Sequence, residues 1–302
     1  MHEIELRGID GGSLLGFLAA VGTLRVVTKP PADSGVRMKW VLTDCWRPVL
    51  LHQEIETKAE LLTVLSAMLC GGKTADAAWK IGNDLTLALD EFREQLRTVA
   101  AASRTENRGT SDFLAAFGSE IIGSGPKKEQ MSDTEFRTMS GAGHQHFLGF
   151  MRELAETTET SHLDRTLFRK WDYADSRPSL RWDTADYRPH ALRAEDPSGD
   201  PIRTMRGANR LAIEALPLFP TLPDGRRVRT TGFEDRNRVT EITWPIWSEP
   251  LGLDTVRSLL CSAEVQEADR HTMFARGVVQ VFRAKRFTEG KYRNFSPARA
   301  LL

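Results

Sequence analysis

The carboxylates best suited to chemistry lie in a motif that occurs twice between Trp171 and Arg193. Each copy reads Trp-Asp-x-Ala-Asp-x-Arg-Pro and closes with Leu-Arg a few residues later. Carboxylate oxygens suit Mg²⁺, which usually takes one or two of them together with water and phosphate oxygens. One hypothesis therefore places a divalent ion on the four aspartates of the repeat: Asp172, Asp175, Asp183 and Asp186.

A structural interpretation of the repeat competes with the metal hypothesis. Four arginines accompany the four aspartates, and neighbouring surface charges of opposite sign commonly neutralise each other. Each aspartate can also cap a turn, and each Arg-Pro pair favours an extended exit. Trp171 and Trp182 suit anchors in a hydrophobic core. The sequence favours this structural interpretation, and it predicts no cofactor.

Two histidines precede the repeat and could act as bases or ligands. His144 and His146 follow a small glycine-containing loop, and such a loop can present backbone N–H groups to a phosphate. The loop lacks the lysine and the spacing of a P-loop. Histidines two residues apart diverge on a helix, so a shared metal would need further ligands from elsewhere. The enzyme hypothesis is a metal- or phosphate-dependent reaction at the aspartates, with these histidines nearby.

Three arginines with no acid between them form a second candidate site. Arg203, Arg206 and Arg210 are three and four residues apart, so a helix would place them on one face, with Asn209 beside it. Planar guanidinium groups recognise phosphate oxygens well, which suits the backbone of a nucleic acid. The alternative is that these arginines pair with the acidic residues between 172 and 200.

The strongest local charge lies between Arg276 and Arg299. Seven cationic residues and one acid give this segment a net charge of +6. Cations interleaved with aromatic residues are typical of surfaces that bind RNA or single strands, because aromatic faces stack on bases while cations contact phosphates. A basic edge strand that resists aggregation would carry similar charges. The residues predicted to contact nucleic acid here are Arg283, Lys285, Arg286, Phe287, Lys291, Tyr292 and Arg293.

Short strands and amphipathic helices must position these residues. Alternating apolar residues predict strands at 2–9 and 36–42, and 46–51 is expected as the antiparallel neighbour of the latter. Further strands are expected at 226–233, 239–247 and 278–287. Apolar spacings of three and four predict helices at 14–27, 58–70, 85–101, 144–157, 203–216 and within 253–274. Because strands and helices are grouped rather than strictly alternating, we expect an α+β fold. It would combine antiparallel sheet elements with several packed helices in a mixed topology.

Composition favours a globular protein in a reducing compartment. The chain has 302 residues, of which 40% are apolar and 27% charged, and its 41 basic and 41 acidic side chains balance. We expect an N-terminal α+β region over 1–135 and a C-terminal one with the basic tail over 136–302, or one continuous domain. Three scattered cysteines argue against disulfides, and the longest apolar run is too short and polar to span a bilayer. These features predict a cytoplasmic protein with no membrane partner.

The run after the first predicted strand resembles a known protein family. Residues 6–25 read LRGIDGGSLLGFLAAVGTLR, which is similar to the N-terminal signature of CRISPR-associated proteins from type I-G (formerly I-U) systems. The run Arg-Gly-Ala-Asn-Arg at 206–210 is loosely similar to proteins of the same loci. The resemblance implies a subunit or accessory of an RNA-guided surveillance complex (Cascade). Such a subunit would have a large-subunit-like role in holding guide RNA or target DNA.

The residues and the resemblance together predict a non-catalytic, nucleic-acid-binding subunit of a prokaryotic CRISPR antiviral effector complex. Its partners would be the other effector subunits and the guide RNA or target DNA. The first alternative is the metal- or phosphate-dependent enzyme described above. The second is a protein–protein scaffold whose basic tail docks an acidic partner.

Overall fold

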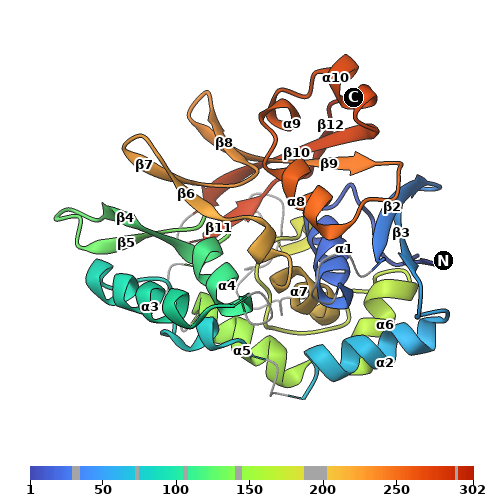
Figure 1. Ribbon diagram of the computed structural model, residues 1–302, viewed down its shortest axis with the longest axis horizontal. Coiled ribbons are helices and arrows are strands. Elements are labelled where there is room, and N and C mark those ends of the chain that lie inside the picture. The colour runs from blue at the N-terminus through green and yellow to red at the C-terminus, as the bar shows by residue number, and fades with distance from the viewer. Residues whose placement is uncertain (29–34, 72–74, 105–107, 140–144, 187–202, 290–291) are drawn as a thin grey trace, which may run out of the picture.

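Helix α1 lies at the centre of the molecule (Figure 1). The computed structural model describes residues 1–28, 35–71, 75–104, 108–139, 145–186, 203–289 and 292–302. Within it, α1 (Leu14–Val27) begins after the N-cap Ser13 and buries every residue except Arg25. A helix that is apolar on all sides belongs in a core. Helix α7 (Arg206–Ile213) packs so closely on α1 that a Cβ at Gly22 would lie 2.0 Å from the carbonyl oxygen of Leu211.

A three-stranded antiparallel sheet lies beside α1. Strand β3 (Trp46–His52) runs between β1 (His2–Glu5) and β2 (Arg37–Leu42). Trp40 of β2 stacks on Phe17 of α1, with their ring centroids 5.9 Å apart. Aromatic contacts of this kind bury large apolar areas, so they fix the sheet to the central helix.

A second antiparallel sheet carries the basic tail. Its strands follow the order β11-β10-β9-β8, and β12 also pairs with β10. The indole N–H groups of Trp244 and Trp247 in β9 donate to the carbonyl oxygens of Gly11 and Met38, so both sheets share one core. The strands are β8 (Phe233–Arg236), β9 (Val239–Trp247), β10 (Val278–Glu289), β11 (Tyr292–Phe295) and β12 (Arg299–Ala300).

Two further hairpins project on the same side of the molecule as the β8–β9 hairpin (Figure 1). Strand β4 (Gly118–Ser124) pairs with β5 (Gln130–Asp133), and β6 (Thr221–Asp224) pairs with β7 (Arg227–Thr230). The hydroxyl groups of Thr134 and Thr230 lie 3.0 Å apart and join the base of the first hairpin to the second.

The remaining helices complete the core around α1 and α7. Helix α2 begins with a capping box, in which Thr57 and Glu60 satisfy each other's backbone N–H groups. In Figure 1, α2, α5 and α6 lie along the lower side of the molecule. These helices are α2 (Lys58–Leu69), α3 (Leu89–Ala102), α4 (Gly109–Phe117), α5 (Phe147–Thr157), α6 (Thr160–Phe168), α8 (Leu253–Leu260), α9 (Ala263–Glu267) and α10 (Arg270–Ala275).

The α+β class is confirmed, with several element boundaries shifted. The helix expected from 203 begins at Arg206, because Thr204 pairs with Asp175 as an isolated bridge. The strand expected over 226–233 is split at Gly232, whose φ of +83° turns the chain into β8. A single hydrophobic cluster contains residues from both sides of position 135. None of the helices in the described ranges is both long and apolar enough to cross a bilayer.

Candidate nucleic-acid interface

The first copy of the doubled motif has a structural role. Arg165 of α6 lies 2.8 Å from the carboxylate of Asp175 and 3.4 Å from that of Asp172. Asp175 is buried and also accepts a hydrogen bond of 2.9 Å from the backbone N–H of Arg206, the first residue of α7. An aspartate at this position satisfies one of the free N–H groups at a helix start. The cation that neutralises these aspartates therefore comes from α6 and not from the repeat itself.

The second copy anchors its loop through Trp182. This side chain is 1% exposed, and its indole N–H donates to the carbonyl oxygen of Phe136 at 2.9 Å. Asp183 is buried and accepts from the Tyr173 hydroxyl at 3.1 Å and from the Ala185 N–H at 2.9 Å. Burial raises the pKa of Asp183. Trp171 is half-buried, so the two tryptophans are not equivalent.

The metal hypothesis lacks a cluster of ligands in the described parts of the chain. No three His, Cys, Asp or Glu side chains there are grouped to hold an ion. His146 lies beside Asp84, with 4.0 Å between its Nδ1 and a carboxylate oxygen. His144 and residues 187–202 lie outside the described residues, and so does the side chain of Asp186.

The prediction of a phosphate-binding face on α7 is wrong for two of its four residues. Arg210 is fully buried, with its guanidinium 2.8 Å from Glu214 and over the ring of Trp79. Asn209 is fully buried as well, and its side-chain oxygen accepts from the N–H of Leu180 at 2.9 Å. Because α7 packs between α1 and α6, its polar face points into the protein and is used for internal hydrogen bonds.

The other two arginines of that group lie nearer the surface. Arg206 is half-buried and donates to the carbonyl oxygens of Thr157 and Arg177 at 3.4 and 3.1 Å. Arg203 precedes the helix and is exposed. Of the four residues in this group, Arg203 therefore has the surface position that a phosphate contact requires.

The basic tail forms the β10–β11 hairpin, which divides its cations between two faces. Side chains alternate along a strand, and residues opposite each other in an antiparallel pair share a face. Arg286 and Arg293 therefore lie on one face, because Arg286 pairs with Phe295 and Thr288 pairs with Arg293. Lys285 is exposed on the opposite face, which it shares with the half-buried Phe287.

The remaining predicted contacts of the basic tail are Arg283, Lys291 and Tyr292. Arg283 is buried, donates to the Thr243 hydroxyl at 2.9 Å and lies 3.9 Å from Glu241, so its prediction as a nucleic-acid contact is wrong. Burial lowers the pKa of its guanidinium. Lys291 lies outside the described residues, and so does the side chain of Tyr292, whose backbone begins β11.

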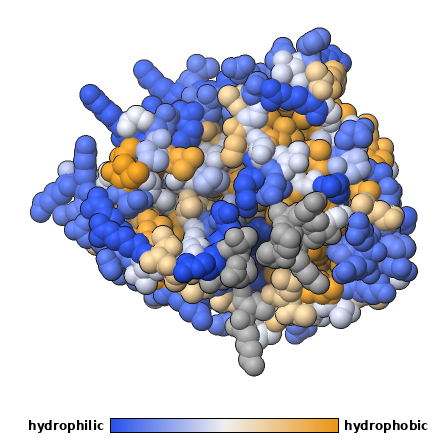
Figure 2. All heavy atoms as spheres, in the orientation of Figure 1, coloured by the Kyte–Doolittle hydropathy of each residue, from blue (hydrophilic) through white to orange (hydrophobic). Residues whose placement is uncertain are grey.

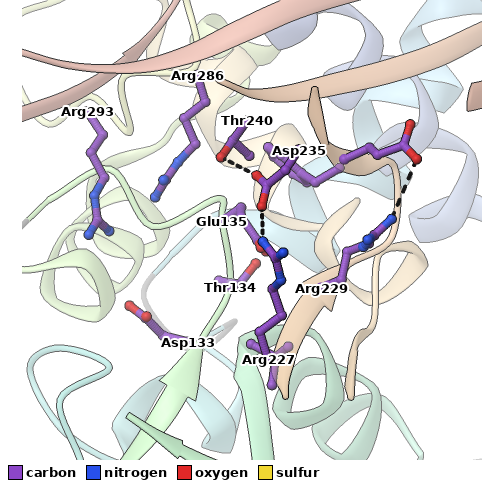
Figure 3. Close-up of a pocket in the computed structure, with 12 residues that line it drawn as sticks. Asp133, Thr134, Glu135, Arg227, Arg229, Asp235, Thr240, Arg286 and Arg293 are labelled. Carbon is purple, nitrogen blue, oxygen red and sulfur yellow. Dashed lines mark hydrogen bonds and ion pairs between the residues drawn. The ribbon is translucent and has the colours of Figure 1, made fainter. Parts of the chain in front are cut away.

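Arg286 and Arg293 enter one cleft side by side (Figure 3). Both guanidinium groups donate to the carbonyl oxygen of Arg137, at 3.0 and 3.3 Å, and neither is paired with a described carboxylate. The Nε of Arg286 is buried without a hydrogen-bond partner. Burial and the nearby Arg293 charge lower the pKa of Arg286 to about 10, so it stays cationic at neutral pH.

The acids of this cleft are largely occupied. The cleft has a volume of about 230 Å³. Asp133 is 2.7 Å from Arg137, and Asp235 is paired with Arg227. Glu135 forms no ion pair with a described cation, but its carboxylate accepts from the N–H of Thr230 at 3.0 Å. Two unpaired guanidiniums thus face one unpaired carboxylate, and the local balance favours an anion.

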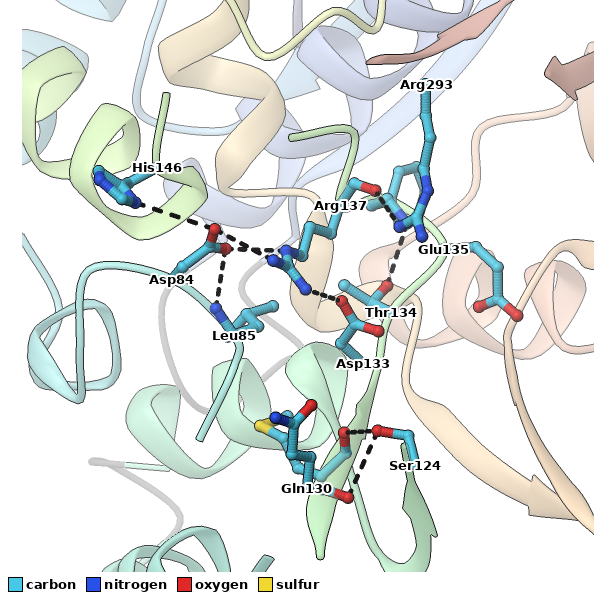
Figure 4. A network of polar contacts seen from close by, with 12 residues as sticks. Asp84, Leu85, Ser124, Gln130, Asp133, Thr134, Glu135, Arg137, His146 and Arg293 are labelled. Atoms are coloured by element: carbon cyan, nitrogen blue, oxygen red, sulfur yellow. Dashed lines mark hydrogen bonds and ion pairs between the residues drawn. The ribbon is translucent and has the colours of Figure 1, made fainter. Parts of the chain in front are cut away.

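Arg137 supports the two cleft arginines through its carbonyl oxygen, and its role was not predicted from the sequence. Its side chain lies 2.8 Å from the buried Asp84 and 2.7 Å from Asp133 (Figure 4). Its carbonyl oxygen accepts from both tail arginines. The spacing Asp133-x-x-x-Arg137 is the signal in the sequence that could have found it. The approach of β11 is not encoded locally, because the Arg293 N–H bonds to the carbonyl of Thr138, 155 positions away.

The sequence was compared with protein families and with curated proteins. No family model and no curated protein matches the chain.

Proposed function

We propose that this protein is a non-catalytic, nucleic-acid-binding subunit of a prokaryotic CRISPR effector complex. It would contact the backbone of guide RNA or target DNA through the cleft of Arg286 and Arg293. The observation that carries the binding proposal is this pair of unpaired guanidiniums with a shared orientation. The likeness of residues 6–25 to type I-G proteins supports the choice of complex.

Phosphate oxygens match the donors that the cleft leaves free. A guanidinium carries five N–H donors, and each of the two uses a single one on the carbonyl of Arg137. Hydrogen bonds between ionised partners are about twice as strong as neutral ones, and arginine can present two parallel donors to one phosphate. Four of the residues predicted from sequence are kept as proposed contacts. Arg286 and Arg293 lie in the cleft, and the exposed Arg203 and Lys285 lie outside it.

The binding proposal is tested by fluorescence anisotropy with labelled single-stranded RNA and DNA of about 20 nucleotides over a salt series. The double variant Arg286→Gln, Arg293→Gln should weaken binding at least tenfold. It should also lower the log–log salt slope by about 0.7 to 0.9 for each phosphate that the variant no longer neutralises. Arg7→Gln is the matched control, because Arg7 is exposed, paired with Glu5 and outside the lining of the cleft.

Two results would count against the proposal. Wild-type protein that binds neither probe at low salt would contradict nucleic-acid binding and favour the scaffold alternative. Equal weakening in the cleft variant and in Arg7→Gln would show a general charge effect. The choice of complex is tested separately by co-expression with neighbouring effector subunits, since a member of the complex should copurify with them and with nucleic acid.

A further inference from the structure

Three hairpin tips present exposed cations that have no partner. None of these side chains forms a hydrogen bond or an ion pair within the described parts of the chain. The β4–β5 tip supplies two of them, and the β6–β7 and β8–β9 tips supply one each. They are Lys127, Lys128, Arg226 and Arg238.

The three hairpins are held next to each other by contacts between neighbouring strands. Arg227 of β7 forms an ion pair with Asp235 of β8, and Arg229 lies 3.7 Å from Glu234. Thr134, at the base of the β4–β5 hairpin, contacts Thr230 of β7. Figure 1 shows the tips along one margin of the molecule, and Figure 2 shows hydrophilic side chains standing out from that margin. A ligand would therefore meet a prearranged row of charges, which lowers the entropy cost of binding.

Two of the cations occupy backbone positions that disfavour them. Lys128 has a φ of +56° and Arg238 a φ of +66°. Tight hairpin turns often need this left-handed conformation, and glycine or asparagine usually supplies it because a long side chain is strained there. The β6–β7 tip follows the usual pattern, with Gly225 at φ +63°. Strained residues of this kind cluster at functional sites.

We infer that the three tips form a second contact line for the phosphate backbone of a nucleic acid, alongside the Arg286–Arg293 cleft. This inference rests on the proposed function. The tips suit a polyanion because their acids are mostly occupied: Asp224 is paired with Arg229 and Asp235 with Arg227, which leaves Glu129 beside Lys128. The tips carry no aromatic residue, which distinguishes them from hairpins that insert into a lipid surface.

The first experiment removes the charges and keeps the fold. The quadruple variant Lys127→Gln, Lys128→Gln, Arg226→Gln, Arg238→Gln should bind a labelled RNA of about 20 nucleotides at least tenfold more weakly, with a salt slope lower by about 3. Inorganic phosphate, which is small enough for the cleft of about 230 Å³ and has no backbone that could extend to the tips, should bind both proteins equally. The control for loss of charge removes four exposed cations away from the tips, in the variant Arg7→Gln, Lys80→Gln, Arg97→Gln, Lys170→Gln.

The second experiment relieves the backbone strain at Lys128 and Arg238. Lys128→Gly and Arg238→Gly should each raise the melting temperature, by about 2 °C, because glycine accepts the left-handed conformation. The same variants should weaken binding of the long RNA. A purely structural role for these residues predicts no change in binding, and that result would overturn the inference.

The outcomes separate this inference from the proposed function. If the cleft variant loses binding and the tip variant does not, the contact line is wrong and the cleft proposal stands. If the wild-type protein binds neither RNA nor DNA, both are wrong. If the tips instead mediate binding to vesicles of anionic phospholipid and leave RNA affinity unchanged, the surface recognises a membrane and the inference is overturned.

Discussion

Asp183 shows how a candidate metal ligand becomes a buried structural acid. Its carboxylate accepts hydrogen bonds from Tyr173 and Ala185, yet burial still raises its pKa. Burial dominates because removing a charge from water costs more than these neutral donors return. A carboxyl whose pKa is raised by burial is a weaker ligand for a magnesium-type ion, which needs the ionised form. We therefore expect the titration of Asp183 to affect the pH dependence of protein stability and not the binding of a metal ion.

Asp183→Asn should therefore change the pH dependence of stability. The folded state holds the Asp183 proton more tightly than the unfolded chain, whose pKa is 3.8. Wild-type stability should consequently fall as the pH rises from 3.8 through the raised folded pKa, and asparagine, which keeps an oxygen acceptor, should remove this fall. Urea denaturation between about pH 3 and pH 7 measures the difference. Parallel pH profiles for the two proteins would show that Asp183 titrates normally.

At the scale of elements, the two copies of one motif have different structural fates. Trp182 packs edge-to-face on Phe136 and Phe147 inside the core, whereas Trp171 is half-buried beside Tyr173. The repeat is visible in the sequence, and its interpretation as a tryptophan-anchored structural loop agrees with these contacts. The difference between the copies is not visible there, because it depends on residues 136 and 147 reaching the second copy.

Trp182→Ala should cost about 3 to 5 kcal/mol of unfolding free energy, the range for a fully buried aromatic residue. The equivalent change in the first copy, Trp171→Ala, should cost clearly less because that side chain is partly in water. Both values come from chemical denaturation of the purified variants. Similar destabilisation at the two positions would mean that the second copy is not the main anchor.

Helical and strand periodicity located most elements but could not orient them. The apolar run of α1 and the alternation in β2 were predicted because local sequence determines them, and β3 was expected as the antiparallel neighbour of β2. The spacing of Arg206 and Arg210 correctly placed them on a helix, but it could not show that this face is turned inward. That depends on Trp79 and Glu214, which the fold brings to Arg210. The cleft was found only in part, since Asp133 and Arg137 come from a distant segment.

At the scale of the whole molecule, α1 and α7 join the N-terminal and C-terminal halves into one core. The joint is tight, because a Cβ at Gly22 would meet the backbone of Leu211 at 2.0 Å. Backbone cannot move aside as the end of a flexible side chain can, so any larger residue must separate the helices. The contact between α1 and α7 affects the arrangement of the cleft and of the hairpin tips only through the rest of the core.

Gly22→Ala should destabilise the protein by about 1 to 3 kcal/mol, the usual cost of overpacking a core. Gly149→Ala is the matched control, because a Cβ at Gly149 in α5 would meet the His146 Cβ at 3.3 Å, and alanine gains helix propensity there. Thermal unfolding of both variants gives the comparison. A neutral or stabilising Gly22→Ala would mean that α1 and α7 can move apart freely.

Helix α1 is synthesised long before the helix that covers it. Its partner α7 follows about 180 residues later, which at ribosomal rates of about 5 to 20 residues per second is a delay on the order of 10 to 40 s. During that interval the sheet of β1, β2 and β3 can already pack on α1, but the face of α1 that α7 later covers stays exposed. The yield of folded protein should therefore depend on what shields this helix during translation, and chaperones that bind nascent chains should raise it more than slow refolding conditions do afterwards.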